Sequence, residues 1–164
     1  MNLSEDVLMD VAAIAIALVG FSGVVTALGR RGSGKWSPSE TLQLRTLVDP
    51  CIVTLIAAFV PIGLGLVTAN AEIIWRASNA VVFVGHVFGF AAFLRRGSTD
   101  TILLSQKIWS AITVAVLLGT LSASLGLHGW HQLTFLMGLA LGIGVSLQNF
   151  YLLLFPAHEM SDSD

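Results

Sequence analysis

Apolar residues run along this chain in five long stretches, and none of the five carries a Lys, Arg, Asp or Glu in its interior. A bilayer core about 30 Å thick needs roughly 20 apolar residues in helical form. Because the apolar residues are continuous and do not alternate with polar ones, the pattern predicts helices and not barrel strands. The stretches are Val11–Leu28, Cys51–Ala69, Ile73–Leu94, Ile108–Leu127 and Leu133–Phe155.

We therefore expect an all-α integral membrane protein with five transmembrane helices, forming a single membrane domain over residues 1–164. Composition agrees, because 55% of the residues are hydrophobic and only 11% are charged, whereas about 25% are charged in soluble domains. The five spans are expected at about 7–28, 51–69, 72–94, 104–127 and 131–155.

Local start signals refine these boundaries. Ser37-Pro38-Ser39-Glu40 is a capping box with proline at the first helical position, which predicts a short helix at about 38–48 lying in the membrane interface. Asp49-Pro50 is then expected to begin the second span, with Asp49 as its cap. Asn70 is expected to cap the third span in the same way.

Basic residues predict the orientation. Seven of the eight Lys and Arg residues lie in the connections between the first and second and between the third and fourth spans, and Arg76 is the exception. Five alternating crossings place these two connections on the same side of the membrane. Positively charged loops stay in the cytoplasm, so the N-terminus is expected outside and the C-terminus inside, in the inner (plasma) membrane of a bacterium. The aromatic residues that prefer membrane interfaces fit this topology. They are Trp36, Trp75, Trp109, Trp130 and Tyr151, and the seven basic residues are Arg30, Arg31, Lys35, Arg45, Arg95, Arg96 and Lys107.

Small residues spaced four apart predict where helices touch, because they let backbones approach closely in lipid. Such ladders occur in the fourth and fifth stretches, which a short connection joins, so we expect those two helices to pack closely. The sequence leaves open whether these ladders pack within one chain or between chains. The predicted packing residues are Gly85, Gly89, Ala115, Gly119, Ala123, Gly138, Gly142 and Ser146.

His86 is the one ionisable residue near the middle of a span. Burial of a histidine is costly unless the ring is neutral and hydrogen-bonded. Two interpretations stay open: a functional role, as a cofactor ligand, ligand contact or proton relay, and a purely structural hydrogen bond to a neighbouring helix. A haem with two axial histidines would need a second histidine at matching depth, which this chain lacks, and no cofactor follows from the sequence.

A second group of candidates lies at the expected outer surface. His128 and His131 are three residues apart, and Glu72 falls on the same side. Two imidazoles and a carboxylate are suitable ligands for zinc or copper. The alternative is that all three are ordinary polar residues of turns and helix ends.

Gln148 and Asn149 lie in the inner half of the fifth stretch, and Pro61 interrupts the second. Amides in lipid must find hydrogen-bond partners, so these side chains are expected either to hold helices together or to line a polar pathway. Pro61 is expected to weaken its helix locally and is a candidate for the same pathway.

Three classes of function remain open. The first is a helical subunit or scaffold of a homo- or hetero-oligomeric membrane assembly, the second a protomer of an oligomeric channel or transporter, and the third a redox or metal-binding subunit. Expected partners are the lipid bilayer and further copies or other membrane proteins. No basic cluster with interleaved aromatics points to nucleic acid, and no hydrolase, zinc-protease or phosphate-loop motif points to an enzyme.

Overall fold

A computed structural model describes residues 4–33, 38–96 and 104–154. These form five helices, namely α1 (Glu5–Ser33), α2 (Pro38–Gly65), α3 (Ala71–Arg96), α4 (Leu104–Ser124) and α5 (His131–Leu154). All five are long and apolar enough to cross a membrane. The prediction of an all-α protein with five candidate spans is confirmed, and the chain is a multi-pass membrane protein in contact with lipid. Lys35, Trp36 and the C-terminal residues 155–164 lie outside the described part.

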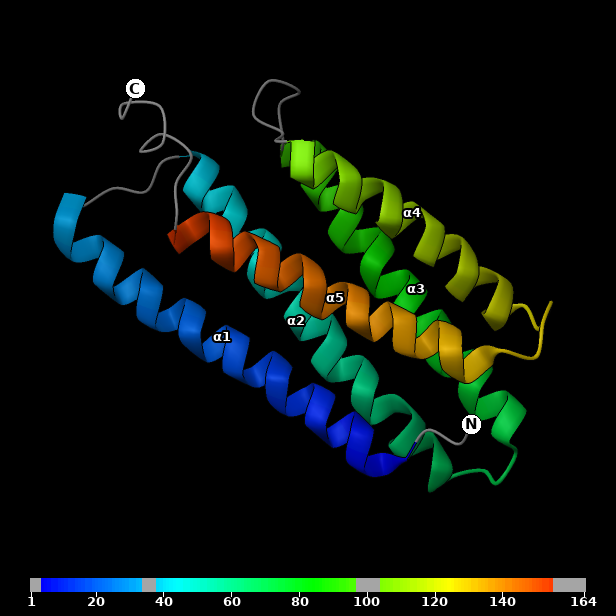
Figure 1. Cartoon of the computed structure of the whole chain (residues 1–164). Coiled ribbons are helices and arrows are strands. Elements are labelled where there is room, and N and C mark those ends of the chain that lie inside the picture. Colours follow the sequence, from blue (N-terminus) through cyan, green and yellow to red (C-terminus); the bar gives the residue numbers. More distant parts are fainter. Residues whose placement is uncertain (1–3, 34–37, 97–103, 155–164) are drawn as a thin grey trace.

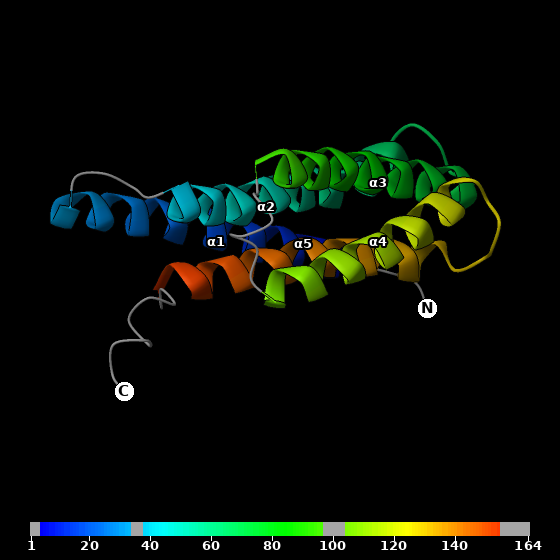
Figure 2. The ribbon, with the colours of Figure 1, turned by 90° about the horizontal axis from the view of Figure 1, so that it is seen from above.

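Consecutive helices run in opposite directions, so the ends of all five gather at two poles (Figure 1). We call the pole with Arg45, Arg95 and Lys107 the basic end. Glu5 and Glu72, at the starts of α1 and α3, lie at the opposite pole. Seen from above, α2 and α3 form one layer and α4 and α5 the facing layer (Figure 2), while α1 contacts α2 and α5.

Most of the apolar surface faces outward. Only 22% to 33% of the apolar window of each span is buried within the protein. Exposed side chains include Phe88 at 72% and Leu118 at 64% of their surface. Such faces would be unfavourable in water, whereas lipid tails solvate them at no cost.

The most extensive contact joins α2 and α5. A cluster of buried side chains beside it unites four helices, with Phe135 and Leu139 of α5 completely enclosed. Trp75 of α3 meets the ring of Phe135 edge-on, with the centroids 5.6 Å apart. The other buried members are Leu8, Ala57 and Val82.

One boundary prediction was wrong, because α2 continues without a break from Pro38 to Gly65 through Pro50 and Pro61. No separate interfacial helix exists at 38–48. Leu47 is fully buried, and its carbonyl accepts a 2.7 Å hydrogen bond from the Ser146 hydroxyl of α5. Packing against α5 therefore replaces contact with the membrane surface. Pro50 has no N–H, so it leaves the carbonyl of Thr46 without its usual helical partner.

The helix ends at the pole opposite the basic end are capped by side chains and by glycine. Asn70 accepts hydrogen bonds from the N–H groups of Glu72 and Ile73 at 3.1 and 3.3 Å, which confirms its predicted cap. Gly126 adopts a φ of 74° after α4. The N–H of Leu127 then bonds back to the Ser122 carbonyl at 3.0 Å, as in a Schellman motif.

Four glycines of the described helices mark the closest approaches between helices, and one of them is Gly144, which faces Trp109 of α4. A methyl group on Gly85 would meet Val53 of α2, and one on Gly138 would meet Val82 of α3. A methyl group on Gly142 would meet the Thr54 hydroxyl of α2. The contacts of Gly138 and Gly142 bring α5 against α3 and α2. The predicted contact between α4 and α5 is also present, since a methyl group on Gly138 would lie 3.5 Å from the Thr120 methyl of α4.

The remaining predicted packing residues divide into two groups. Ala123 and Ser146 are fully buried, and Gly119 lies at ordinary contact distance, 3.8 Å, from the Thr134 methyl of α5. Ala115 is exposed, and a methyl group on Gly89 would meet nothing within 4 Å. The small-residue rule alone does not separate these groups, because it does not tell which face of a helix has a neighbour.

We predict opposite effects for two glycine substitutions. Gly138→Ala places a methyl group against Val82 and should lower the free energy of unfolding by about 1–3 kcal/mol. Gly89→Ala enters open space and should be neutral, or stabilising by about 0.5 kcal/mol through helix propensity. Unfolding in mild detergent measures both; equal stability of the two variants would contradict the assigned contacts.

Candidate functional site

His86 joins α3 to α5 near the middle of the bundle. Its side chain is 7% exposed, and Nε2 lies 2.9 Å from the carbonyl oxygen of Gly138. A carbonyl only accepts, so Nε2 carries the hydrogen and donates. In the neutral ring, Nδ1 is then left as an acceptor. This geometry is the hydrogen bond between helices that the structural interpretation of His86 required.

The same ring forms the inner wall of a cavity between four helices. The cavity occupies about 70 Å³ and extends from His86 toward the basic end. Each of α2, α3, α4 and α5 contributes to its wall, whereas α1 does not. Asp49 of α2, Thr113 of α4 and Asn149 of α5 are among the polar residues that line it.

Some buried polar atoms in this wall lack hydrogen-bond partners among the residues that the structure describes. Asn149 is 2% exposed; its Nδ2 donates to the Val145 carbonyl at 2.8 Å, but its Oδ1 accepts no hydrogen bond. Gln148 Nε2 is likewise buried and unpaired. A buried polar group without a partner costs about 1–3 kcal/mol, so water or a ligand is needed to complete this cavity. The volume is sufficient for a few water molecules.

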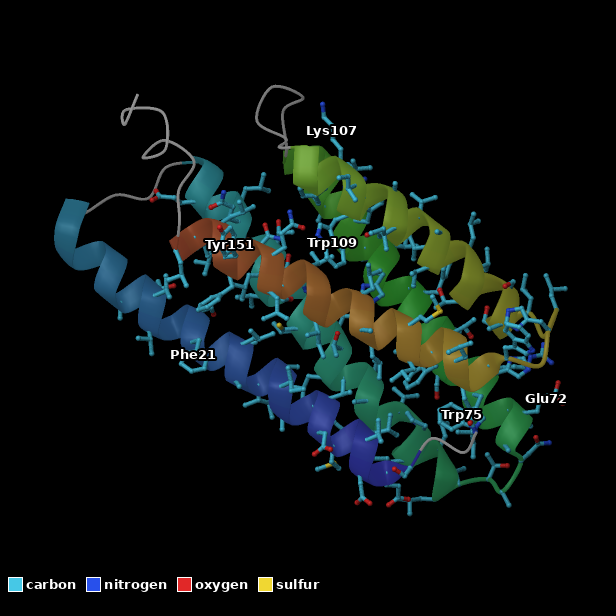
Figure 3. All side chains as sticks on the ribbon, in the orientation of Figure 1. Phe21, Glu72, Trp75, Lys107, Trp109 and Tyr151 are labelled. Atoms are coloured by element: carbon cyan, nitrogen blue, oxygen red, sulfur yellow. The ribbon has the colours of Figure 1, made fainter. Side chains whose placement is uncertain are left out.

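Aromatic side chains close the rest of the cavity. Trp109 points from α4 toward α5 (Figure 3), where its indole edge would lie 2.6 Å from a methyl group on Gly144. Phe90 and Phe93 of α3 stack at 6.4 Å. The ring of Trp109 therefore fits only because residue 144 has no side chain. Lys107, two residues nearer the start of α4, points away from the bundle (Figure 3).

The structure brings some predicted residues together and separates others. Gln148, Asn149 and His86 share this cavity, as do Gly85, Gly89 and Gly142. Pro61, which the sequence suggested for the same pathway, is buried in the opposite half of α2 and does not line it. Asp49, Thr113 and Trp109 were missed as site residues. Asp49 was missed because its expected role as a helix cap already explained an acidic residue at that position. Thr113 and Trp109 were missed because the sequence does not show which face of their helix points into the bundle.

The predicted metal ligands at the other end have different partners. His128 Nδ1 accepts the N–H of Trp130 at 3.2 Å, so Nε2 donates to the Ser122 hydroxyl at 3.0 Å. Glu72 pairs with Arg76 at 3.3 Å. The rings of His128 and His131 stack 5.9 Å apart. No metal-binding group of three His, Cys, Asp or Glu side chains occurs among the described residues, so the geometry gives this metal site no support.

Arg76 instead holds α3 to the end of α4. Its guanidinium donates to the carbonyls of Ser124 and Leu125 at 3.1 and 3.3 Å. A positive charge at a helix C-terminus is favourable because the terminal carbonyls are unpaired and carry negative partial charge. The single basic residue at this pole thus has a structural role.

Comparison with models of protein families, with curated proteins and with solved structures found no match to this chain. Function must therefore be inferred from the cavity itself.

We predict that the His86 hydrogen bond contributes measurably to stability. His86→Leu removes the donor and should cost about 0.6–1.7 kcal/mol, the range for polar contacts between membrane helices. His86→Gln keeps a donor of similar reach and should recover part of the loss. Unfolding by denaturing detergent gives the comparison, and a leucine variant as stable as the glutamine variant would argue against the bond.

Proposed function

We propose that the protein is a protomer of a membrane channel or carrier, and that the cavity between α2, α3, α4 and α5 is the inner half of its polar pathway. One observation carries this proposal. Asn149 presents a carbonyl oxygen that is almost completely buried and has no partner among the described residues. This oxygen lies in the wall of a cavity that reaches the bundle centre. A scaffold whose only task was packing would gain from pairing that atom or replacing it with carbon.

The wall also combines features of ligand sites. Such sites are mostly apolar with a few polar groups that fix orientation, and here Phe90, Phe93 and Trp109 accompany Asn149 and Gln148. Beyond His86, the contact of Gly138 with Val82 closes the bundle. A pathway that is open on one side and closed on the other is what alternating access requires.

We further propose that the basic end faces the cytoplasm of a bacterium, across its inner membrane. Arg45, Arg95 and Lys107 support this orientation through the positive-inside bias. The cavity then opens toward the cytoplasmic side, and the N-terminus of α1 lies outside.

A scaffold role is the second candidate, favoured by the outer face of α1. Ala13, Ala17 and Gly20 are exposed there, and a methyl group on Gly20 would meet nothing within 4 Å. A smooth face of this kind suits close packing against another helix in lipid. It is compatible with the first candidate, because a helix that does not line the cavity is free to join protomers.

Chemical labelling tests whether the cavity is a water-filled entrance. In a Cys51→Ala background, Gln148→Cys should react with silver ion added at the cytoplasmic face, because this charged reagent is small enough for the cavity of about 70 Å³ and thiols react as thiolates, which need water. Leu147→Cys is the matched control, since the neighbouring side chain is 49% exposed to lipid.

The control should stay unmodified under the same conditions in inside-out vesicles. Equal inertness of the two cysteines would refute the aqueous entrance. Reaction of Gln148→Cys only from the opposite face would invert the proposed orientation.

A further inference from the structure

We propose that the cavity binds a small primary ammonium ion, ammonium itself or a short alkylammonium, with its N–H groups directed at Asn149 Oδ1 and the carboxylate of Asp49. This inference rests on the proposed function, because it names the ligand class of the same cavity. Three independent features of the wall lead to it: its hydrogen-bond acceptors, its charge and its size.

Several groups in the wall accept hydrogen bonds. Asn149 Oδ1 is unpaired, and the neutral His86 ring keeps Nδ1 as an acceptor because Nε2 donates to Gly138. Thr113 donates its hydroxyl hydrogen to the Trp109 carbonyl at 2.8 Å, so its oxygen offers only lone pairs. Gln148 Nε2 is the exception, but rotating its amide exchanges that donor for an acceptor. A primary ammonium group, with three donors and no acceptor, matches this wall.

The charge of the wall has one sign. Asp49 lines the cavity, and no Lys or Arg does so among the described residues. Asp49 already has an interaction in the structure; a carboxylate offers about four lone-pair sites, so a ligand N–H would share the carboxylate with that interaction. The aromatic rings of Trp109, Phe90 and Phe93 also favour a cation over an anion.

Size limits the ligand to a few heavy atoms. An apolar interior cavity of about 150 Å³ holds one benzene molecule, and this cavity has about half that volume, 70 Å³. An aromatic amine is therefore too large, whereas ammonium, methylammonium and ethylammonium fit. The N–H groups separate this class from sodium and from quaternary amines, neither of which donates a hydrogen bond.

Thermal unfolding of the full-length protein in nanodiscs tests the ligand class without any substitution. Ethylammonium chloride should raise the midpoint temperature in a saturable manner. Sodium chloride at equal ionic strength and tetramethylammonium chloride should not, since both lack N–H donors. Equal shifts from all three salts would overturn the proposal.

Two substitutions then test the assigned contacts by direct titration of ethylammonium. Asp49→Asn removes the charge and should weaken binding by at least about tenfold, as expected for a lost hydrogen bond to a charged group. Thr113→Val removes one acceptor at nearly constant volume and should weaken it severalfold. Its matched control is Thr120→Val, because that buried hydroxyl also bonds within α4, to the Leu117 carbonyl at 3.1 Å, but does not line the cavity.

Unchanged binding in Asp49→Asn would overturn the cation assignment. Acetamide, a neutral group that both donates and accepts, distinguishes the two proposals. If acetamide stabilises the protein and ethylammonium does not, the ligand class is wrong while the binding function stands. If neither ligand stabilises it and Gln148→Cys also remains unlabelled, the proposed function fails as well.

Discussion

Where α3 crosses α5, the backbone of Gly138 makes two contacts with α3. Its Cα lies against Val82, and its carbonyl accepts the Nε2–H of His86 at 2.9 Å. Lipid supplies no hydrophobic drive for helices to associate, so close packing and hydrogen bonds between helices must hold the bundle. Both occur at this crossing. One turn further along α5, Gly142 repeats the close approach toward Thr54 of α2, and the Ser146 hydroxyl then bonds to the Leu47 carbonyl. The run of small residues thus places α2 and α3 against one face of α5.

That arrangement also creates the cavity. The Gly138 contact closes the bundle on one side of His86. On the other side, α4 reaches α5 through the large indole of Trp109, which rests on Gly144. In the wall between them, Asn149 Oδ1 and Gln148 Nε2 have no partner in the described part of the chain. Close packing and the polar wall therefore lie side by side, and among the described residues unpaired buried polar atoms also occur outside the wall, at Thr54 and Asn79.

Sequence reasoning predicted the five helices, because uninterrupted apolar length is a direct consequence of bilayer thickness, and it predicted the Asn70 cap from local chemistry. Sequence reasoning did not predict which faces of the helices pack together. A helix in lipid is apolar around its whole circumference, so the periodicity of apolar residues does not reveal which face meets a neighbouring helix. For this reason Gly89 could not be distinguished from Gly138. Gly144 and Trp109 were missed for the same reason.

The break expected at Asp49-Pro50 was wrong because burial of Leu47 against α5 outweighs the bond that Pro50 removes. Gln148, Asn149 and His86 stood out by polarity, but only the register of four helices brings them to one cavity.

Disulfide formation tests the central contact most directly. A β-carbon on Gly138 would lie 3.7 Å from that of Val82, within the range of about 3.5–4.5 Å that disulfides require. Val82→Cys also removes the methyl that would otherwise obstruct residue 138. In a Cys51→Ala background, the pair Val82→Cys and Gly138→Cys should oxidise within one chain, losing both free thiols while the protein keeps its monomer mobility. Thiols that stay free, or cross-links that form only between chains, would contradict the account.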